Sequence, residues 1–117
     1  MELNKECVRD ILLVIESRND EPIFHQKFLD FPELRECSNE IKTYTANKLF
    51  EAGYINGNFD TYYDNSIYLA INSITWDGHI YLDNIRDPRI WDKTKKAASK
   101  VVGVSLPLLG ELAKGIL

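Results

Sequence analysis

A helix that ends at a glycine and continues directly into extended chain is the feature that most constrains this fold. Residues 38–57 read SNEIKTYTANKLFEAGYING. Ser38 is a favourable N-cap, and Glu40 places a carboxylate in the first turn, where it complements the positive end of a helix. Gly53 supplies the left-handed position that ends many helices, and Asn56-Gly57 is typical of a hairpin turn. The segment therefore predicts a helix that stops at Gly53 and a strand and turn that follow it.

This order of elements is the centre of a winged helix-turn-helix. A short helix over residues 32–37 and a turn at Cys37-Ser38 would complete the helix pair. Ile23, Phe24 and His25 are expected to form a short third strand. Ile67, Leu69 and Ile71 alternate and predict a strand that pairs back with residues 54–56, so that residues 56–66 form the tip, or wing. The expected class is α+β, mostly helical, with a small antiparallel β-hairpin and additional C-terminal helices.

Three further helical segments flank this centre. Apolar residues at helical spacing predict a helix over residues 4–19, broken by Asn19, Asp20 and Pro22, although the run 11–15 is equally compatible with a buried strand. Thr75 caps the helix that follows the hairpin, and a second segment begins at Asp87, with Pro88 at its start, and runs to about residue 102. Ser105 caps a last amphipathic helix. We expect a winged-helix-like domain with a helical extension over residues 1–102, and an oligomerisation element over residues 103–117.

Composition excludes several classes of function. The chain has 117 residues and a formal net charge of −4, so no basic field of the whole protein attracts nucleic acid or anionic lipid. Cys7 and Cys37 lack the spacing of a zinc or redox motif and are expected to be buried thiols in a reducing cytoplasm. The polar N-terminus does not resemble a signal peptide, and the last helix is too short to span a bilayer. We expect a cytoplasmic protein without a membrane partner.

Three blocks of sequence resemble a small phage- and prophage-associated family of unknown function. They are CVRDIL with Ile15-Glu16, LFEAGYI over residues 49–55, and ITWDGHIYLDNIRD over residues 74–87 with Trp91 beyond it. The resemblance covers most of the chain and implies a winged-helix-like fold in a bacterial or phage setting, without an activity. Members of that family tend to place a His in the middle helix where this chain has Thr45, so no role of that His carries over.

His79 is the strongest candidate for chemistry, because it follows Gly78 near Asp77 and Asp83 and could act as a general base in a hydrolase-type enzyme. No second His supports it, and no nucleophile, phosphate-loop or metal motif is present. We therefore expect no enzyme, cofactor, metal or small-molecule substrate. Structural roles are expected for Gly53, Thr75, Trp76, Gly78, His79 and Trp91. Both tryptophans are expected in the core, and an interface anchor is the alternative for them.

A sequence-specific DNA-binding regulator is the alternative suggested by the fold. The outer side of the central helix would offer Asn39, Thr43, Ala46, Asn47 and Phe50, with Lys42 on the flank. Phosphate contacts would come from Lys93, Lys95 and Lys96, because residues 86–100 carry six cations and two carboxylates. The wing opposes this reading, since it has Asp60 and Asp64 and no Lys or Arg.

The leading hypothesis is a non-enzymatic regulatory module that binds protein. Aromatic residues without neighbouring cations favour a protein partner, and the candidate interface residues are Phe50, Phe59, Tyr62 and Tyr63. The apolar C-terminal helix further suggests self-association, and deletion of residues 106–117 is then expected to yield a monomer.

Overall fold

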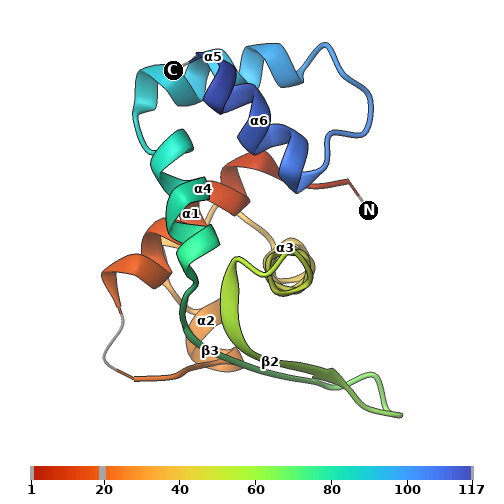
Figure 1. The fold of residues 1–117 in the computed structure, drawn as a ribbon. Helices are drawn as coiled ribbons and strands as arrows, with labels where there is room; N and C mark the ends of the chain where they lie inside the picture. Colours follow the sequence, from red (N-terminus) through yellow and green to blue (C-terminus); the bar gives the residue numbers. More distant parts are fainter. Residues whose placement is uncertain (1, 19–20, 117) are drawn as a thin grey trace.

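The computed structural model describes residues 2–18 and 21–116. Figure 1 shows an α+β fold that is mostly helical, with a small three-stranded antiparallel sheet at one end. The elements are, in order, α1 (Lys5–Ser17), β1 (Ile23–Phe24), α2 (His25–Leu29), the 3-10 helix η1 (Pro32–Leu34), α3 (Asn39–Glu51), β2 (Ile55–Thr61), β3 (Ile67–Ile74), α4 (Trp76–Ile85), α5 (Pro88–Ala98) and α6 (Leu106–Ile116).

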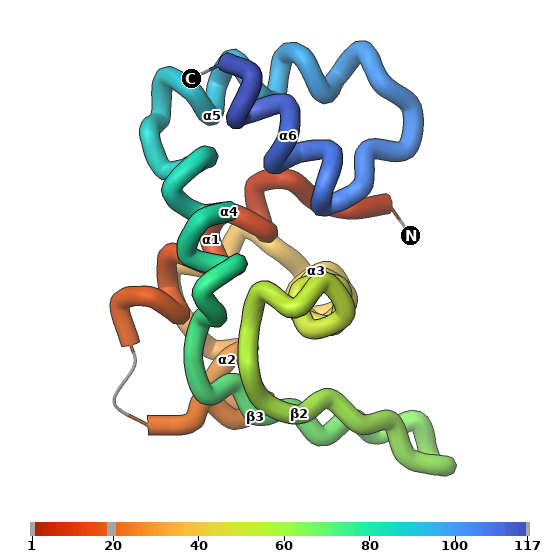
Figure 2. Tube along the Cα trace, viewed as in Figure 1, coloured from red at the N-terminus to blue at the C-terminus, as the bar shows by residue number. Residues whose placement is uncertain are grey.

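The molecule is elongated, 41 × 30 × 24 Å, because helices and sheet occupy different ends. Figure 2 shows α5 and α6 together at one end and the β2–β3 hairpin projecting from the other, with α1, α3 and α4 between them. The core follows this axis, since α1 packs against α3, α4 and β3 while α6 packs against α4 and α5. In the described ranges, no helix combines the length and apolar character needed to cross a membrane.

Both ends of α3 have the predicted structure. The Ser38 side chain accepts a hydrogen bond from the Ile41 N–H at 3.2 Å, and Gly53 has a φ of +76°. The Tyr54 N–H donates to the Leu49 carbonyl and the Gly53 N–H to the Phe50 carbonyl, both at 3.0 Å. These two bonds form a Schellman motif, which satisfies carbonyls that the helix leaves unpaired. The predicted helix and its stop at Gly53 are confirmed.

The hairpin is confirmed, but its turn lies further along the chain than the sequence predicted. Asn56-Gly57 falls inside β2 at an irregularity in the register with β3, where Gly57 has a φ of +148°. A Cβ at Gly57 would lie 1.9 Å from the Ala70 carbonyl oxygen, so the close approach of the two strands requires glycine. The turn instead spans residues 62–66, where the Tyr62 N–H donates to the Ser66 carbonyl at 2.9 Å.

The N-terminal half contains two differences from the predicted elements. The predicted third strand exists as β1, which pairs with β3, but His25 begins α2, a short helix that the residue pattern did not predict. The short helix predicted over residues 32–37 exists as a 3-10 helix that is limited to Pro32–Leu34. The first helix is confirmed as α1 with Asn4 as its N-cap; Asn19 and Asp20, the predicted helix breakers, lie outside the described residues.

Thr75 and Gly78 join the hairpin to α4 as structural residues. The Thr75 hydroxyl accepts from the Gly78 N–H at 2.9 Å, which confirms the N-cap, and donates to the Gly53 carbonyl at 2.7 Å. A Cβ at Gly78 would lie 2.1 Å from the Tyr54 carbonyl oxygen, so α4 begins in direct contact with the start of the hairpin. The end of α3, the start of β2 and the start of α4 therefore form one joint.

The two tryptophans differ in burial. Trp91 is 3% exposed, as expected, and its indole N–H donates to both oxygens of the Glu6 carboxylate at 3.2 Å. Trp76 is 76% exposed, so the prediction of a core position is wrong. As the first residue of α4, Trp76 lies beyond the part of the helix that packs on the core, whose buried residues are Gly78, Tyr81, Leu82 and Ile85.

The two cysteines are free and buried, as predicted. Burial raises the pKa of the Cys7 thiol well above its usual value, and the neighbouring Cys37 side chain raises the pKa further. The thiol is therefore neutral in the core of the folded protein.

Candidate functional site

A groove between α3 and the β2–β3 hairpin brings together residues from both predicted binding surfaces. Its volume is about 490 Å³, and its lining comes from one side of α3 and from the face of the hairpin that α3 covers. The lining residues are Asn39, Glu40, Thr43, Tyr44, Asn47, Phe59, Thr61 and Ile67. Three predicted DNA contacts, Asn39, Thr43 and Asn47, thus share a groove with the predicted protein contact Phe59.

Two residues assigned to the outer side and flank of α3 are instead buried. Lys42 is 4% exposed, and its ammonium group donates to the Leu29 carbonyl at 2.7 Å, so its assignment to the exposed flank of α3 as a DNA contact is wrong. Ala46 is fully buried, which corrects its assignment to the outer face. The physical reason is that α3 packs against α1, α2 and β2. It therefore buries a wider face than the single apolar stripe on which the prediction was based.

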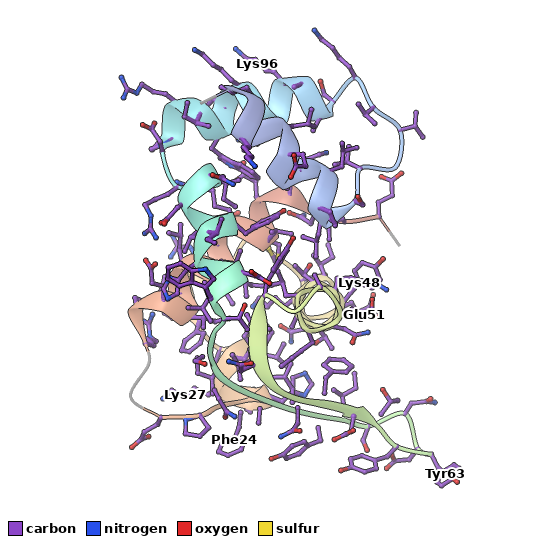
Figure 3. The ribbon with its side chains drawn as sticks, viewed as in Figure 1. Phe24, Lys27, Lys48, Glu51, Tyr63 and Lys96 are labelled. Atoms are coloured by element: carbon purple, nitrogen blue, oxygen red, sulfur yellow. The ribbon has the colours of Figure 1, made fainter. Side chains whose placement is uncertain are left out.

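Aromatic residues connect the groove to the hairpin. The Phe50 and Phe59 rings lie 6.1 Å apart with planes tilted by 53°, and both side chains are half-buried. They hold the hairpin against α3 in an edge-to-face type of contact. Tyr62 and Tyr63 are exposed at the tip, where Figure 3 shows Tyr63 far from the body of the molecule. Of the predicted interface residues, the two tyrosines are therefore accessible, whereas the two phenylalanines serve mainly as supports.

The charge of the groove and hairpin is negative. Glu40 is the one ionisable carboxylate among the lining residues of the groove, and none of them is Lys or Arg. Asp64 lies at the hairpin tip, where hydrogen bonds from the Ser66 hydroxyl (2.6 Å) and N–H (3.0 Å) lower the pKa of its carboxyl group. On the next part of α3, Lys48 is paired with Glu51 at 3.0 Å. The groove thus offers amides, hydroxyls and aromatic rings without a positive charge.

The predicted phosphate contacts of α5 lie elsewhere. Figure 3 shows Lys96 at the end of the molecule opposite Tyr63. Lys95 forms an ion pair with Glu6 and lies 3.7 Å from Asp92, so its charge is used within the fold. The structure therefore does not bring Lys93, Lys95 or Lys96 together with Asn39, Thr43 and Asn47.

His79 lies in an ion-pair cluster between α1 and α4. Its Nδ1 is 3.5 Å from a Glu16 oxygen, and Arg86 donates to both Glu16 oxygens at 2.7 and 2.6 Å. The bidentate Arg86 contact lowers the pKa of the Glu16 carboxyl group. Over residues 2–18 and 21–116, no group of three or more His, Cys, Asp and Glu side chains has the arrangement of a metal site.

A second hollow, of about 700 Å³, was not anticipated from the sequence. It lies between the N-terminal segment, α3 and the loop that joins α5 to α6, and its apolar lining includes Leu3, Val102, Val104 and Leu106. The valine-rich loop sequence VVGV over residues 101–104 was the signal available for it. Glu2, Lys5, Lys48 and Glu51 also line it, with two charges of each sign.

Comparison with known proteins places the chain among relatives without an assigned activity. A relative from Haemophilus influenzae, described as an uncharacterized protein, is 29% identical over 120 residues and is matched over 96% of its length by the whole of this chain. No solved structure matches. The family model described as hypothetical protein DUF2513 matches residues 2–105. This chain therefore belongs to the DUF2513 family.

Proposed function

We propose that the chain is a non-enzymatic regulatory module of winged-helix type that binds another protein through the hairpin and the groove beside α3. In this arrangement α3 is the second helix of a helix-turn-helix, the β2–β3 hairpin is the wing, and β1 is the third strand. The Schellman motif at Gly53 and the short joint at Thr75 support this interpretation, because they hold the wing at a set angle to α3. The sequence resemblance to phage- and prophage-associated proteins suggests a regulatory setting.

The observation that carries the proposal is the chemistry of the hairpin and groove. Tyr62 is 55% exposed and Tyr63 fully exposed, next to Asp60 and Asp64 and to a groove without a cationic side chain. Exposed tyrosines contribute large contact areas at low entropic cost and are enriched among residues that dominate protein interfaces. A phosphate backbone would be repelled by the same surface. A protein with a basic or neutral complementary patch fits it better than a nucleic acid.

The test is a comparison of matched aromatic substitutions. Photo-crosslinking from position 63 in bacterial extract would identify a partner, which is then purified and titrated against wild-type protein and a Tyr62→Ser/Tyr63→Ser variant. We expect the variant to bind at least tenfold more weakly, because a truncated hot-spot residue typically costs about 1–2 kcal/mol or more. Both tyrosines are exposed, so the fold should be unchanged.

Trp76→Ser is the control, since it removes another exposed aromatic residue, one that does not line the groove. It should bind the partner like wild type. Equal affinity of the tyrosine variant and wild type for the purified partner would refute the proposal. Phe59→Ser is unsuitable as a test, because Phe59 supports the hairpin through Phe50.

DNA binding is the second candidate, favoured by the position of Asn39, Thr43 and Asn47 in one groove. Amide side chains at these positions have the chemistry that recognises adenine edges. With Lys42 buried and Lys96 at the opposite end, this surface has few cations to bind phosphates. A duplex titration at low and high ionic strength distinguishes the candidates, because a steep loss of affinity with salt that also depends on Asn39 and Asn47 would favour DNA.

A further inference from the structure

The end of the molecule opposite the hairpin carries an exposed ridge of positive charge. Arg89, Lys93, Lys96 and Lys100 are all exposed. Their spacing of 4, 3 and 4 residues places them in one line along α5 and the turn that follows it. Ile90, Trp91, Thr94 and Ala98, on the other side of α5, contact the core or are buried in it. The helix is thus anchored by one face and presents its cations on the other.

Three of these cations lack an acidic partner among the described residues. Arg89 lies 3.3 Å from Asp87, but Lys93, Lys96 and Lys100 take part in none of the ion pairs formed within residues 2–18 and 21–116. Lys95, on the neighbouring side of the helix, is paired with Glu6 and Asp92. Ion pairs within the protein therefore neutralise the charge of Lys95 but not the charges of Lys93, Lys96 and Lys100. The ridge is locally positive, although the chain as a whole has a charge of −4.

Two exposed valines follow Lys100 in the chain, at the rim of the hollow of about 700 Å³. Val101 is 41% exposed and Val102 is 99% exposed, directly after Lys100 in the loop between α5 and α6. Figure 1 shows that this loop leaves α5 at the same end of the molecule. A fully exposed valine beside a line of lysines combines the two terms that hold proteins at an anionic bilayer, which are attraction to headgroups and burial of apolar side chains.

We propose that this ridge, formed by Arg89, Lys93, Lys96, Lys100, Val101 and Val102, binds peripherally to the surface of an anionic lipid membrane. A convex ridge on the outside of a helix fits the flat surface of a membrane. A DNA duplex would contact more cations if it lay in a concave groove. The exposed valines favour lipid over nucleic acid, because a phosphate backbone offers them no apolar environment. The expectation of no membrane partner came from the net charge of the whole chain, and the local charge of this face has the opposite sign.

Vesicle co-sedimentation tests the proposal. The 117-residue protein is mixed with vesicles of phosphatidylcholine, with or without phosphatidylserine, at low and high ionic strength. We expect binding only with phosphatidylserine, weakened by salt. Lys93→Ala/Lys96→Ala should lower the partition coefficient about 25-fold, at about fivefold per lysine near an anionic surface. Val102→Ser should lower it by about threefold or more through lost apolar burial.

The matched control is Lys27→Ala/Arg35→Ala, which removes the same charge from exposed positions on other elements. Figure 3 places Lys27 near the sheet, far from Lys96. This variant and Tyr62→Ser/Tyr63→Ser should partition like wild type, so the result is separate from that of the hairpin experiment. Equal loss in Lys27→Ala/Arg35→Ala and Lys93→Ala/Lys96→Ala would overturn the proposal. An absence of vesicle binding would also overturn the proposal. Binding of a DNA duplex that depends on Lys93 and Lys96, without vesicle binding, would show that the ridge binds nucleic acid instead.

Discussion

Single residues at the joint between α3, β2 and α4 determine how the hairpin leaves the body. Gly53 adopts a left-handed conformation, and Gly78 allows α4 to touch the Tyr54 carbonyl. The Thr75 hydroxyl bonds to both sides of the joint. Because these contacts involve backbone atoms, neighbouring side chains cannot relieve a clash there by changing rotamer. The position of the candidate interface thus depends on residues that do not belong to it.

Replacement of Gly78 by Ala tests this dependence. The new Cβ would lie 2.1 Å from the Tyr54 carbonyl oxygen and 2.7 Å from the Ile74 side chain, so α4 or the hairpin must move. We expect a loss of about 1–3 kcal/mol in the free energy of unfolding, as for other overpacked sites, measured by urea denaturation.

Gly115→Ala in α6 is the control, because a Cβ there meets no atom within 4 Å. It should be neutral or stabilise the protein by up to about 1 kcal/mol through helix propensity. Equal stability of the Gly78→Ala protein and wild type would show that the close approach is not required.

Contacts between elements connect α1 to the α4–α5 region. Arg9 donates to the Ile85 and Arg86 carbonyls at 3.0 and 2.7 Å, and satisfies backbone groups at the end of α4. Glu16 binds Arg86 from the other end of α1. Near the start of α1, Glu6 binds Trp91 and Lys95 of α5. These polar contacts fix the positions of α4 and α5 relative to α1, because apolar faces alone would allow the helices to slide along one another. His79, which lies beside Glu16, belongs to this set of contacts.

The Glu16 contact predicts a pH dependence of stability. The pKa of Glu16 in the folded protein lies below its ordinary value of 4.5, so its stabilising effect is present above that pH and is lost as the pH falls through the folded pKa. Both side chains are partly exposed, so we expect about 0.5–1 kcal/mol. Glu16→Gln should therefore lower the melting temperature by about 2–6 °C at neutral pH and leave it unchanged in acid below the folded pKa.

Glu36→Gln serves as the comparison, because that carboxylate is 87% exposed and lies 3.8 Å from Arg35. Its melting temperature should follow that of wild type at every pH. A constant difference between Glu16→Gln and wild type across the acid range would indicate a packing effect in place of the ion pair.

At the scale of the whole molecule, the C-terminal helix completes the core. Leu106, Leu109 and Ala113 are buried, and the Tyr81 hydroxyl donates to the Leu106 carbonyl at 2.8 Å. Burial raises the pKa of the Tyr81 hydroxyl above its usual range. Deletion of residues 106–117, expected from the sequence to yield a monomer, would therefore remove part of the core. It is not a clean test of self-association.

Substitution of adjacent leucines in α6 separates the two roles. Leu109 is fully buried and Leu108 is 37% exposed. Leu109→Ala should lower the free energy of unfolding by about 2–5 kcal/mol and Leu108→Ala by less than about 1 kcal/mol, as measured by denaturation. If α6 also mediates pairing of two copies, Leu108→Ser should lower the light-scattering mass without unfolding the chain. Similar destabilisation by both alanine substitutions would contradict the observed orientation of α6.

The sequence by itself determined the features that depend on neighbours within a few residues. Asn4, Ser38, Thr75 and Asp87 cap their helices through hydrogen bonds to N–H groups two or three positions away, and Gly53 ends α3 by its own conformational freedom. Such contacts join residues within one turn of the chain, so patterns of residue type predict them. The position of the hairpin turn was misplaced because Asn-Gly also suits an irregularity within a strand.

Only the tertiary structure decided which surfaces face one another. The burial of Lys42, the exposure of Trp76 and the separation of Lys96 from the groove all depend on how α3, α4 and α5 pack against elements distant in sequence. Several faces of one helix could be buried. The face that is buried is the one that gives the largest total burial of apolar area over the whole core. No local pattern contains that sum, which is why one chain can carry an acidic aromatic hairpin and a basic ridge at opposite ends.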